Sequence, residues 1–171
     1  MIAFLVAAIV SGTSYWNDQL EFGVDVPVNA TVCTGLSDAP DRGVYVFLDN
    51  KDKCPDLTKT SLYEYVEKER ISSISVVAWS NSTEQFSSTR DLAKAYCGKS
   101  DGNLFKKNIK GKIGWFCVPK SRKGAISGFF LLNKGSEEGS GVNLQIGLND
   151  GSKISNKEYW NLVNSLTTSK K

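Results

Sequence analysis

The stretch from residue 113 to residue 148, IGWFCVPKSRKGAISGFFLLNKGSEEGSGVNLQIGL, decides the fold class. It holds three strand-like segments, at residues 113–119, 125–133 and 142–148, which are rich in β-branched and aromatic residues. The last one alternates apolar and polar residues, as a half-buried strand does. Residues 128–132 (GFFLL) are too apolar for an exposed face and predict a central strand. Consecutive strands of this kind favour an antiparallel or mixed sheet.

The rest of the chain adds three strands and three helices to this prediction. Strands are predicted at residues 20–28, 44–48 and 71–79. Capping boxes predict helices that begin at Ser61, Ser88 and Ser155. The predicted order is β-β-α-β-α-β-β-β-α, an α+β fold in which two to three helices pack on one side of a sheet of about six strands. The tail from Thr167 onward is expected to fray.

The 171 residues suit one domain, which we place at residues 15–171 after an apolar leader at residues 1–14. Within the leader, Ile2–Val10 is an uninterrupted apolar run with the length of a signal-peptide core, and small residues follow it. No positive residue precedes the run, so either the start codon lies further upstream or the run is an N-terminal strand or helix of the fold. Removal of residues 1–14 is expected to leave the fold intact. No apolar run is long enough to span a bilayer.

The chain has four cysteines, at Cys33, Cys54, Cys97 and Cys117. Their even number and wide spacing favour two disulfides in an oxidising compartment over a zinc site, and four thiols in a cytosolic protein remain the alternative. Of three possible connectivities we favour Cys33–Cys54 and Cys97–Cys117, each closing a loop of about 20 residues. Cysteines and leader together predict export to a periplasm or the extracellular space. The sequons at Asn29 and Asn81 do not decide between the two.

The chain contains no histidine, which excludes Ser-His-Asp and Cys-His catalysis. It also lacks a phosphate-binding P-loop and a nucleophile elbow. A loop rich in oxygen ligands misses the EF-hand spacing, so we interpret it as a hydrophilic loop; its polar residues are Asp49, Asn50, Asp52 and Asp56. We therefore expect no metal, no cofactor and no enzymatic activity. Catalysis by a pair of carboxylates or by a Ser–Lys dyad stays open.

Charge is distributed unevenly along the chain. Residues 1–85 carry 6 basic and 12 acidic residues, whereas residues 86–171 carry 15 basic and 6 acidic ones. The positive excess is concentrated in residues 99–123, which form either a solvated surface or a contact for an acidic partner. The most exposed part of this block is predicted to be a hairpin tip that carries Lys120, Arg122 and Lys123.

Two aromatic residues, Tyr15 and Trp16, lie between the leader and the first predicted strand. Cleavage directly before them would leave them at an exposed N-terminus, where they are a second candidate contact. The aromatic residues inside predicted strands are assigned to the core. They are Trp79, Trp115, Phe129 and Phe130.

These features favour an exported, disulfide-bonded, non-enzymatic module that binds a protein with an acidic surface. Its concrete form is an inhibitor or immunity-type protein that blocks a partner enzyme or toxin. The alternative is a polyanion- or surface-binding protein that uses residues 99–123; nucleic acid is the least favoured polyanion, because export would place the protein among glycans and lipids. A second alternative is a secreted effector or toxin with carboxylate-based hydrolase activity.

Overall fold

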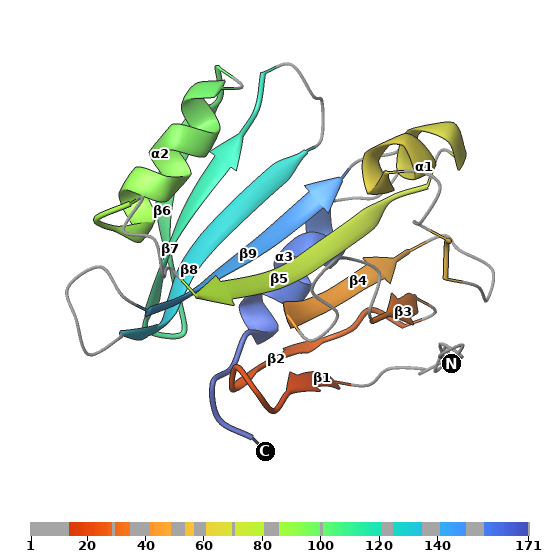
Figure 1. Cartoon of the computed structure of the whole chain (residues 1–171), viewed down its shortest axis with the longest axis horizontal. Coiled ribbons are helices and arrows are strands. Elements are labelled where there is room, and N and C mark those ends of the chain that lie inside the picture. Colours follow the sequence, from red (N-terminus) through yellow and green to blue (C-terminus); the bar gives the residue numbers. More distant parts are fainter. Residues whose placement is uncertain are drawn as a thin grey trace.

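The α+β fold that the sequence predicts is confirmed. The structure, a computed structural model, describes residues 14–28, 30–34, 42–48, 54–56, 61–69, 71–80, 86–99, 101–120, 125–134, 141–149 and 156–170. These described parts contain nine strands and three helices (Figure 1). In chain order they are β1 (Ser14–Asn17), β2 (Phe22–Asp25), β3 (Thr31–Cys33), β4 (Gly43–Phe47), α1 (Leu62–Glu69), β5 (Ser73–Ser80), α2 (Thr89–Lys99), β6 (Asn103–Ile109), β7 (Lys112–Val118), β8 (Ile126–Lys134), β9 (Gly141–Asn149) and α3 (Asn156–Ser165).

Seven strands form one antiparallel sheet in the order β3-β4-β5-β9-β8-β7-β6. The chain crosses from β5 to the far edge at β6 by way of α2, and it returns through β7 and β8 until β9 pairs with β5. The strand predicted to be central, at residues 125–133, is β8, which lies between β9 and β7. β1 and β2 form a separate two-stranded sheet.

The sheet has one apolar face and one more polar face, because successive strand residues point to opposite sides. Strand register places Val76, Ile146 and Phe116 in one row, and all three are fully buried. Ser75 and Ser127 lie in the next row, where both pair with Gly147, so they belong to the opposite face. The apolar face, together with side chains of β2 and α3, forms the main core.

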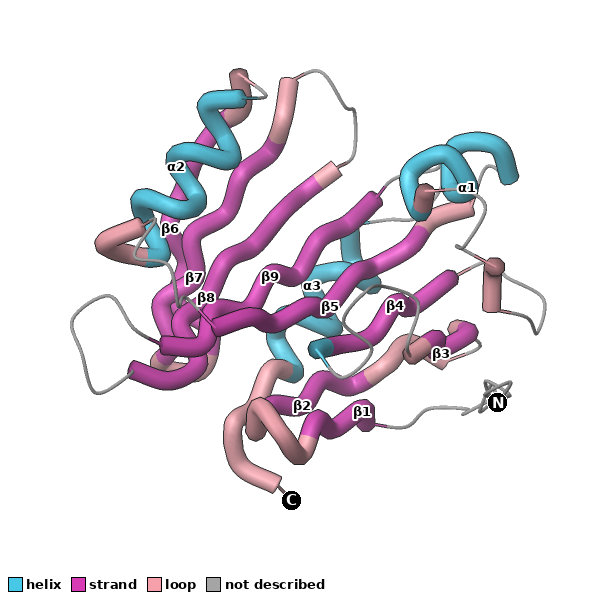
Figure 2. The backbone as a smooth tube through the Cα atoms, in the orientation of Figure 1, coloured by secondary structure: helices cyan, strands magenta, loops and turns pink. Residues whose placement is uncertain are grey.

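Helices cover both faces of the sheet (Figure 2). The Trp160 ring of α3 lies 5.0 Å from the Phe116 ring on the apolar face. The Tyr96 ring of α2 lies 5.2 Å from Phe129, whose neighbour Phe130 points to the apolar face. The expectation that the helices pack on one side is therefore wrong. Because both Phe129 and Phe130 of β8 are buried, this strand needs a cover on each side.

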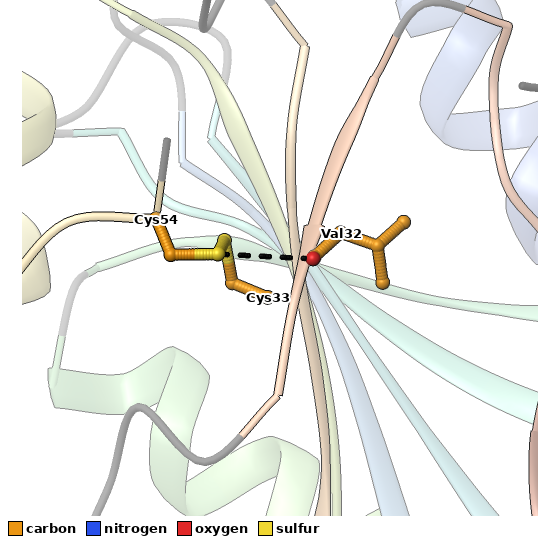
Figure 3. Close-up of a disulfide and its surroundings, with 3 residues drawn as sticks. All are labelled: Val32, Cys33 and Cys54. Carbon is orange, nitrogen blue, oxygen red and sulfur yellow. Dashed lines mark hydrogen bonds between the residues drawn. A yellow bond between two sulfur atoms is a disulfide. The ribbon is translucent and has the colours of Figure 1, made fainter. Parts of the chain in front are cut away.

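Two disulfides, Cys33–Cys54 and Cys97–Cys117, confirm the predicted connectivity. The second joins α2 to β7, and the first joins β3 to the segment at residues 54–56. The Cys54 sulfur lies 3.8 Å from the Val32 carbonyl oxygen, so this bridge rests against the backbone of β3 (Figure 3). The described cysteines leave no free thiol.

The sequence patterns do not predict three of the strands, β1, β3 and β6. β1 and β3 have four and three residues, which is too short to show periodicity. β6 reads NLFKKNI, and its adjacent lysines interrupt any apolar alternation. The capping boxes at Ser61 and Ser88 are confirmed by their hydrogen bonds, whereas Ser155 lies outside the described residues.

The C-terminal tail is held more firmly than expected. Thr167 and Gly23 exchange two backbone hydrogen bonds of 2.9 Å, which extends the β1-β2 sheet. Lys170 forms an ion pair of 2.6 Å with Asp18. The prediction that the tail frays is therefore wrong for residues 167–170. Among the described residues, no helix has the length and apolar composition to cross a membrane.

Candidate protein-binding surface

The basic block of the sequence folds into a hairpin at one edge of the large sheet. β6 and β7 pair over their full length and are joined by Lys110 and Gly111; we call residues 103–118 the basic hairpin. It contains four lysines and neither Asp nor Glu. Within the part of the chain that the structure describes, β6 has β7 on one side and no strand on the other. Positive charge therefore follows the edge of the sheet that the described residues form. The lysines are Lys106, Lys107, Lys110 and Lys112.

The turn of the basic hairpin fixes where these charges lie. Both loop residues have positive φ, 48° at Lys110 and 85° at Gly111, as the type I′ turn of a two-residue hairpin requires. The Gly111 N–H donates to Asn108 Oδ1 at 2.8 Å. Pairing then runs from Ile109–Lys112 to Asn103–Val118 without a register shift. A regular ladder thus sets the spacing of the lysines.

On the α3 side, aromatic rings hold the hairpin against the core. The Phe105 ring stacks on the Phe116 ring with centroids 5.4 Å apart and planes 17° apart. Phe105 is still 37% exposed. Lys107 Nζ lies 3.9 Å from the centroid of the Trp160 ring, a cation–π contact that positions this lysine.

On the α2 side, basic groups lie next to exposed apolar side chains. Arg90 of α2 lies 5.3 Å from the centroid of the Trp115 ring, and Lys106 is the register partner of Trp115. Ile113 is 42% exposed and Leu131 is 36% exposed. Trp115, which the sequence assigned to the core, is half-buried. We call Ile113, Trp115 and Leu131 the apolar patch. Arg and aromatic residues beside apolar ones are the composition enriched in protein interfaces.

The turn predicted as the most exposed binding element lies at the other end of β7. Lys120 is exposed and forms an ion pair of 3.0 Å with Asp101. Arg122 and Lys123 lie outside the described residues. Seven strand residues separate Lys120 from the Lys110 turn, about 20 Å at the usual rise per residue. The structure therefore places Lys120 apart from the basic turn at Lys110.

The second predicted contact lies in β1. Tyr15 is half-buried, and its ring lies 6.0 Å from that of Phe22. Trp16 Nε1 donates to an Asp18 carboxylate oxygen at 3.0 Å. The Trp16 ring packs over Gly23, where a Cβ would lie 2.7 Å from Trp16 Cε3. Both aromatics thus take part in the β1-β2 sheet, which is separate from the large sheet that contains β6.

The sequence places Lys106 in the basic block at residues 99–123, but it does not point to three further residues of this surface, Arg90, Ile113 and Leu131. A signal for the edge strand was present, since Gly111 lies between two lysines and two isoleucines flank that group. Arg90 and Leu131 become neighbours of the hairpin only through the packing of α2 and the pairing of β8, which no local pattern reveals.

The structure gives no grouping that suggests a metal centre. Among the residues it describes, no three side chains of His, Cys, Asp or Glu come together as potential ligands. In the oxygen-rich loop, Asp56 is described and exposed, and residues 49–52 lie outside the described ranges.

Comparison with known proteins shows a similar fold but no matching family. No family model matches the sequence, and no curated protein matches it. A solved structure from Bacteroides thetaiotaomicron VPI-5482 superimposes with a TM-score of 0.55 at 8% sequence identity, over 94% of this chain and 50% of that one. The likeness shows the fold alone. This chain therefore spans about half the length of the protein that it resembles.

Proposed function

We propose that this protein is an exported, non-enzymatic module that binds a partner protein with an acidic surface, as an inhibitor or immunity protein does. The observation that carries the proposal is the basic hairpin, which has four lysines and no carboxylate, lies beside the apolar patch and forms a sheet edge with no further strand next to it in the described parts of the chain. The lysines would attract an acidic partner over a distance, which speeds encounter. The apolar patch would supply the area that is removed from water on contact.

The two disulfides support the extracellular or periplasmic part of this proposal. Such bonds persist in oxidising compartments and are rare in the cytosol. The Cys97–Cys117 bond ties α2 to β7, so Arg90 and the hairpin are held on one rigid frame. A rigid binding surface loses little conformational entropy when a partner binds.

A polyanion is the second candidate, because the same lysines would attract sulfated or phosphorylated chains. A protein partner is favoured by the exposed side chains of Ile113 and Leu131, which a highly charged glycan would not cover. The two candidates differ in what the protein captures from its surroundings, a protein or a glycan.

The test compares three immobilised proteins as baits for the native extracellular or periplasmic fraction. They are the wild type, the hairpin variant Lys106→Gln/Lys110→Gln, and a control with the same charge change on two exposed helical lysines, Lys68→Gln/Lys157→Gln. We expect the wild type and the control to retain one partner and the hairpin variant to lose it. We also expect the soluble wild-type protein to suppress the activity of that partner. Equal retention by all three, or a captured glycan in place of a protein, would contradict the proposal.

A further inference from the structure

The two edges of the large sheet differ in how accessible their backbones are. β3 has three residues, and the Cys33–Cys54 bridge lies against it. β6 has seven residues, pairs with β7 without a bulge and has no further strand beside it among the described residues. A long and regular edge strand is a template on which another extended chain can add.

The turn determines which backbone groups of β6 are available. In a two-residue turn the flanking residues, Ile109 and Lys112, form a hydrogen-bonded pair. Because hydrogen-bonded and non-hydrogen-bonded pairs alternate along an antiparallel ladder, every second residue of β6 directs its N–H and C=O away from β7. These residues are Leu104, Lys106 and Asn108.

Side chains on β6 select the kind of strand that could add. Lys106 and Lys107 project to opposite faces of the sheet, and both are exposed. Two copies of this edge would bring lysines against lysines, which disfavours self-association. A strand with carboxylates on both faces would instead place opposite charges across the new pair. Exposed Phe105 offers apolar contact on one face.

We propose that the partner of this protein binds by adding an acidic, extended segment to β6 as an eighth strand of the sheet. This inference rests on the proposed function and specifies its geometry. The added strand would accept and donate hydrogen bonds at Leu104, Lys106 and Asn108. Its acidic side chains would face Lys106 and Lys107.

The test measures backbone amide hydrogen exchange in the full-length protein with and without a probe peptide. The probe is a blocked peptide, as long as β6, in which pairs of adjacent glutamates alternate with pairs of valines, so that carboxylates lie on both faces of the strand. The control peptide carries lysine in place of glutamate. We expect the probe peptide, but not the control peptide, to slow exchange of the Leu104, Lys106 and Asn108 amides, by about tenfold at saturation. Unchanged exchange at these three amides would overturn the proposal. Slowing that rises with protein concentration in the absence of peptide would also overturn it, since the edge would then accept a second copy.

A pair of variants separates backbone pairing from charge. Lys106→Gln removes the charge and keeps the outward N–H, whereas Lys106→Pro removes both and leaves the β6-β7 ladder its hydrogen bonds. We expect Lys106→Pro to weaken binding of the probe about fivefold more than Lys106→Gln, because one hydrogen bond is lost in addition. Binding that is weakened equally in the two variants would refute strand addition and leave the charge-based function standing. Wild-type binding by both would contradict the function as well. The exchange measurement uses the wild type, so it decides the question even if the proline variant fails to fold.

Discussion

Single residues on the apolar face show how closely the sheet and α3 approach each other. The Tyr159 hydroxyl is fully buried and donates to the Ile146 carbonyl oxygen at 2.9 Å. Burial raises the pKa of this phenol far above its ordinary value. Beneath it lies Gly128, where an added Cβ would be 2.6 Å from Phe116 Cε1 and 3.1 Å from the Tyr159 hydroxyl oxygen.

We expect Gly128→Ala to lower the free energy of unfolding by about 1–3 kcal/mol, because the methyl group overfills a packed core. Gly98→Ala is the matched control, since nothing lies within 4 Å of a Cβ at this position of α2. That change should raise stability by up to about 1 kcal/mol through helix propensity. Urea unfolding of both variants measures the difference. Equal stability of the two would show that α3 does not pack on β8 as described.

At the scale of elements, the start of α2 depends on a local network of hydrogen bonds. Ser88 Oγ accepts from the Asp91 N–H at 3.1 Å, and the hydroxyls of Ser87 and Ser88 donate to Asp91 Oδ2. The hydrogen bond from Ser88, followed by that from Ser87, lowers the pKa of Asp91 below its ordinary value of 3.8. The sequence predicts the part of this network that involves Ser88, because a capping box is a local pattern.

The lowered pKa of Asp91 predicts a pH dependence with a definite sign. The charged carboxylate stabilises α2 at pH values above its ordinary pKa, and this contribution is lost as the pH falls through the lowered folded-state pKa. An NMR titration of the Asp91 carboxyl should have its midpoint below 3.8. In Ser87→Ala/Ser88→Ala the midpoint should return toward that value. A midpoint that is the same in both proteins would exclude the serine hydrogen bonds as the cause.

Each disulfide joins a strand of the large sheet to another segment, and the strand cysteines, Cys33 and Cys117, lie on the same face of that sheet. Replacing Cys97 and Cys117 together by alanine should lower the free energy of unfolding by about 3 kcal/mol, the loop-closure term for a loop of this length. Replacing Cys33 and Cys54 should cost a similar amount, since the sequence separations are 20 and 21. Denaturant unfolding of each double variant provides the measurement. A loss near zero for either pair would show that its bond does not constrain the unfolded chain.

At the scale of the whole molecule, sequence patterns predicted the elements that are long and regular. The alternation at residues 142–148 and the apolar run at residues 128–132 identified the centre of the sheet, and the cysteine spacing identified both bridges. What could not be predicted depends on contacts between distant segments. β1 is a strand because it pairs with β2, and the tail is ordered because Thr167 bonds to Gly23.

The pairing of β1 with β2 limits how many residues can be removed from the N-terminus without loss of stability. Deletion of residues 1–13 should change the melting temperature by only a few degrees, because it leaves the β1-β2 ladder complete from Ser14↔Asp25 to Asn17↔Phe22. Deletion through Asn17 should lower it further, since the β1 ladder and the Tyr15–Phe22 contact are then lost. Thermal unfolding of both truncated proteins checks the order. A large loss from the shorter deletion would identify residues 1–13 as part of the core.

Association kinetics show whether the basic hairpin contacts an acidic protein. The rate constant for binding the captured partner is measured at low and high ionic strength for wild type, Lys106→Gln/Lys110→Gln and Lys68→Gln/Lys157→Gln. We predict that the hairpin variant associates about tenfold more slowly at low salt and shows a weaker salt dependence, because two of the four hairpin lysines are neutralised, while the control matches the wild type. Equal association rates for all three proteins at both salt concentrations would contradict this prediction.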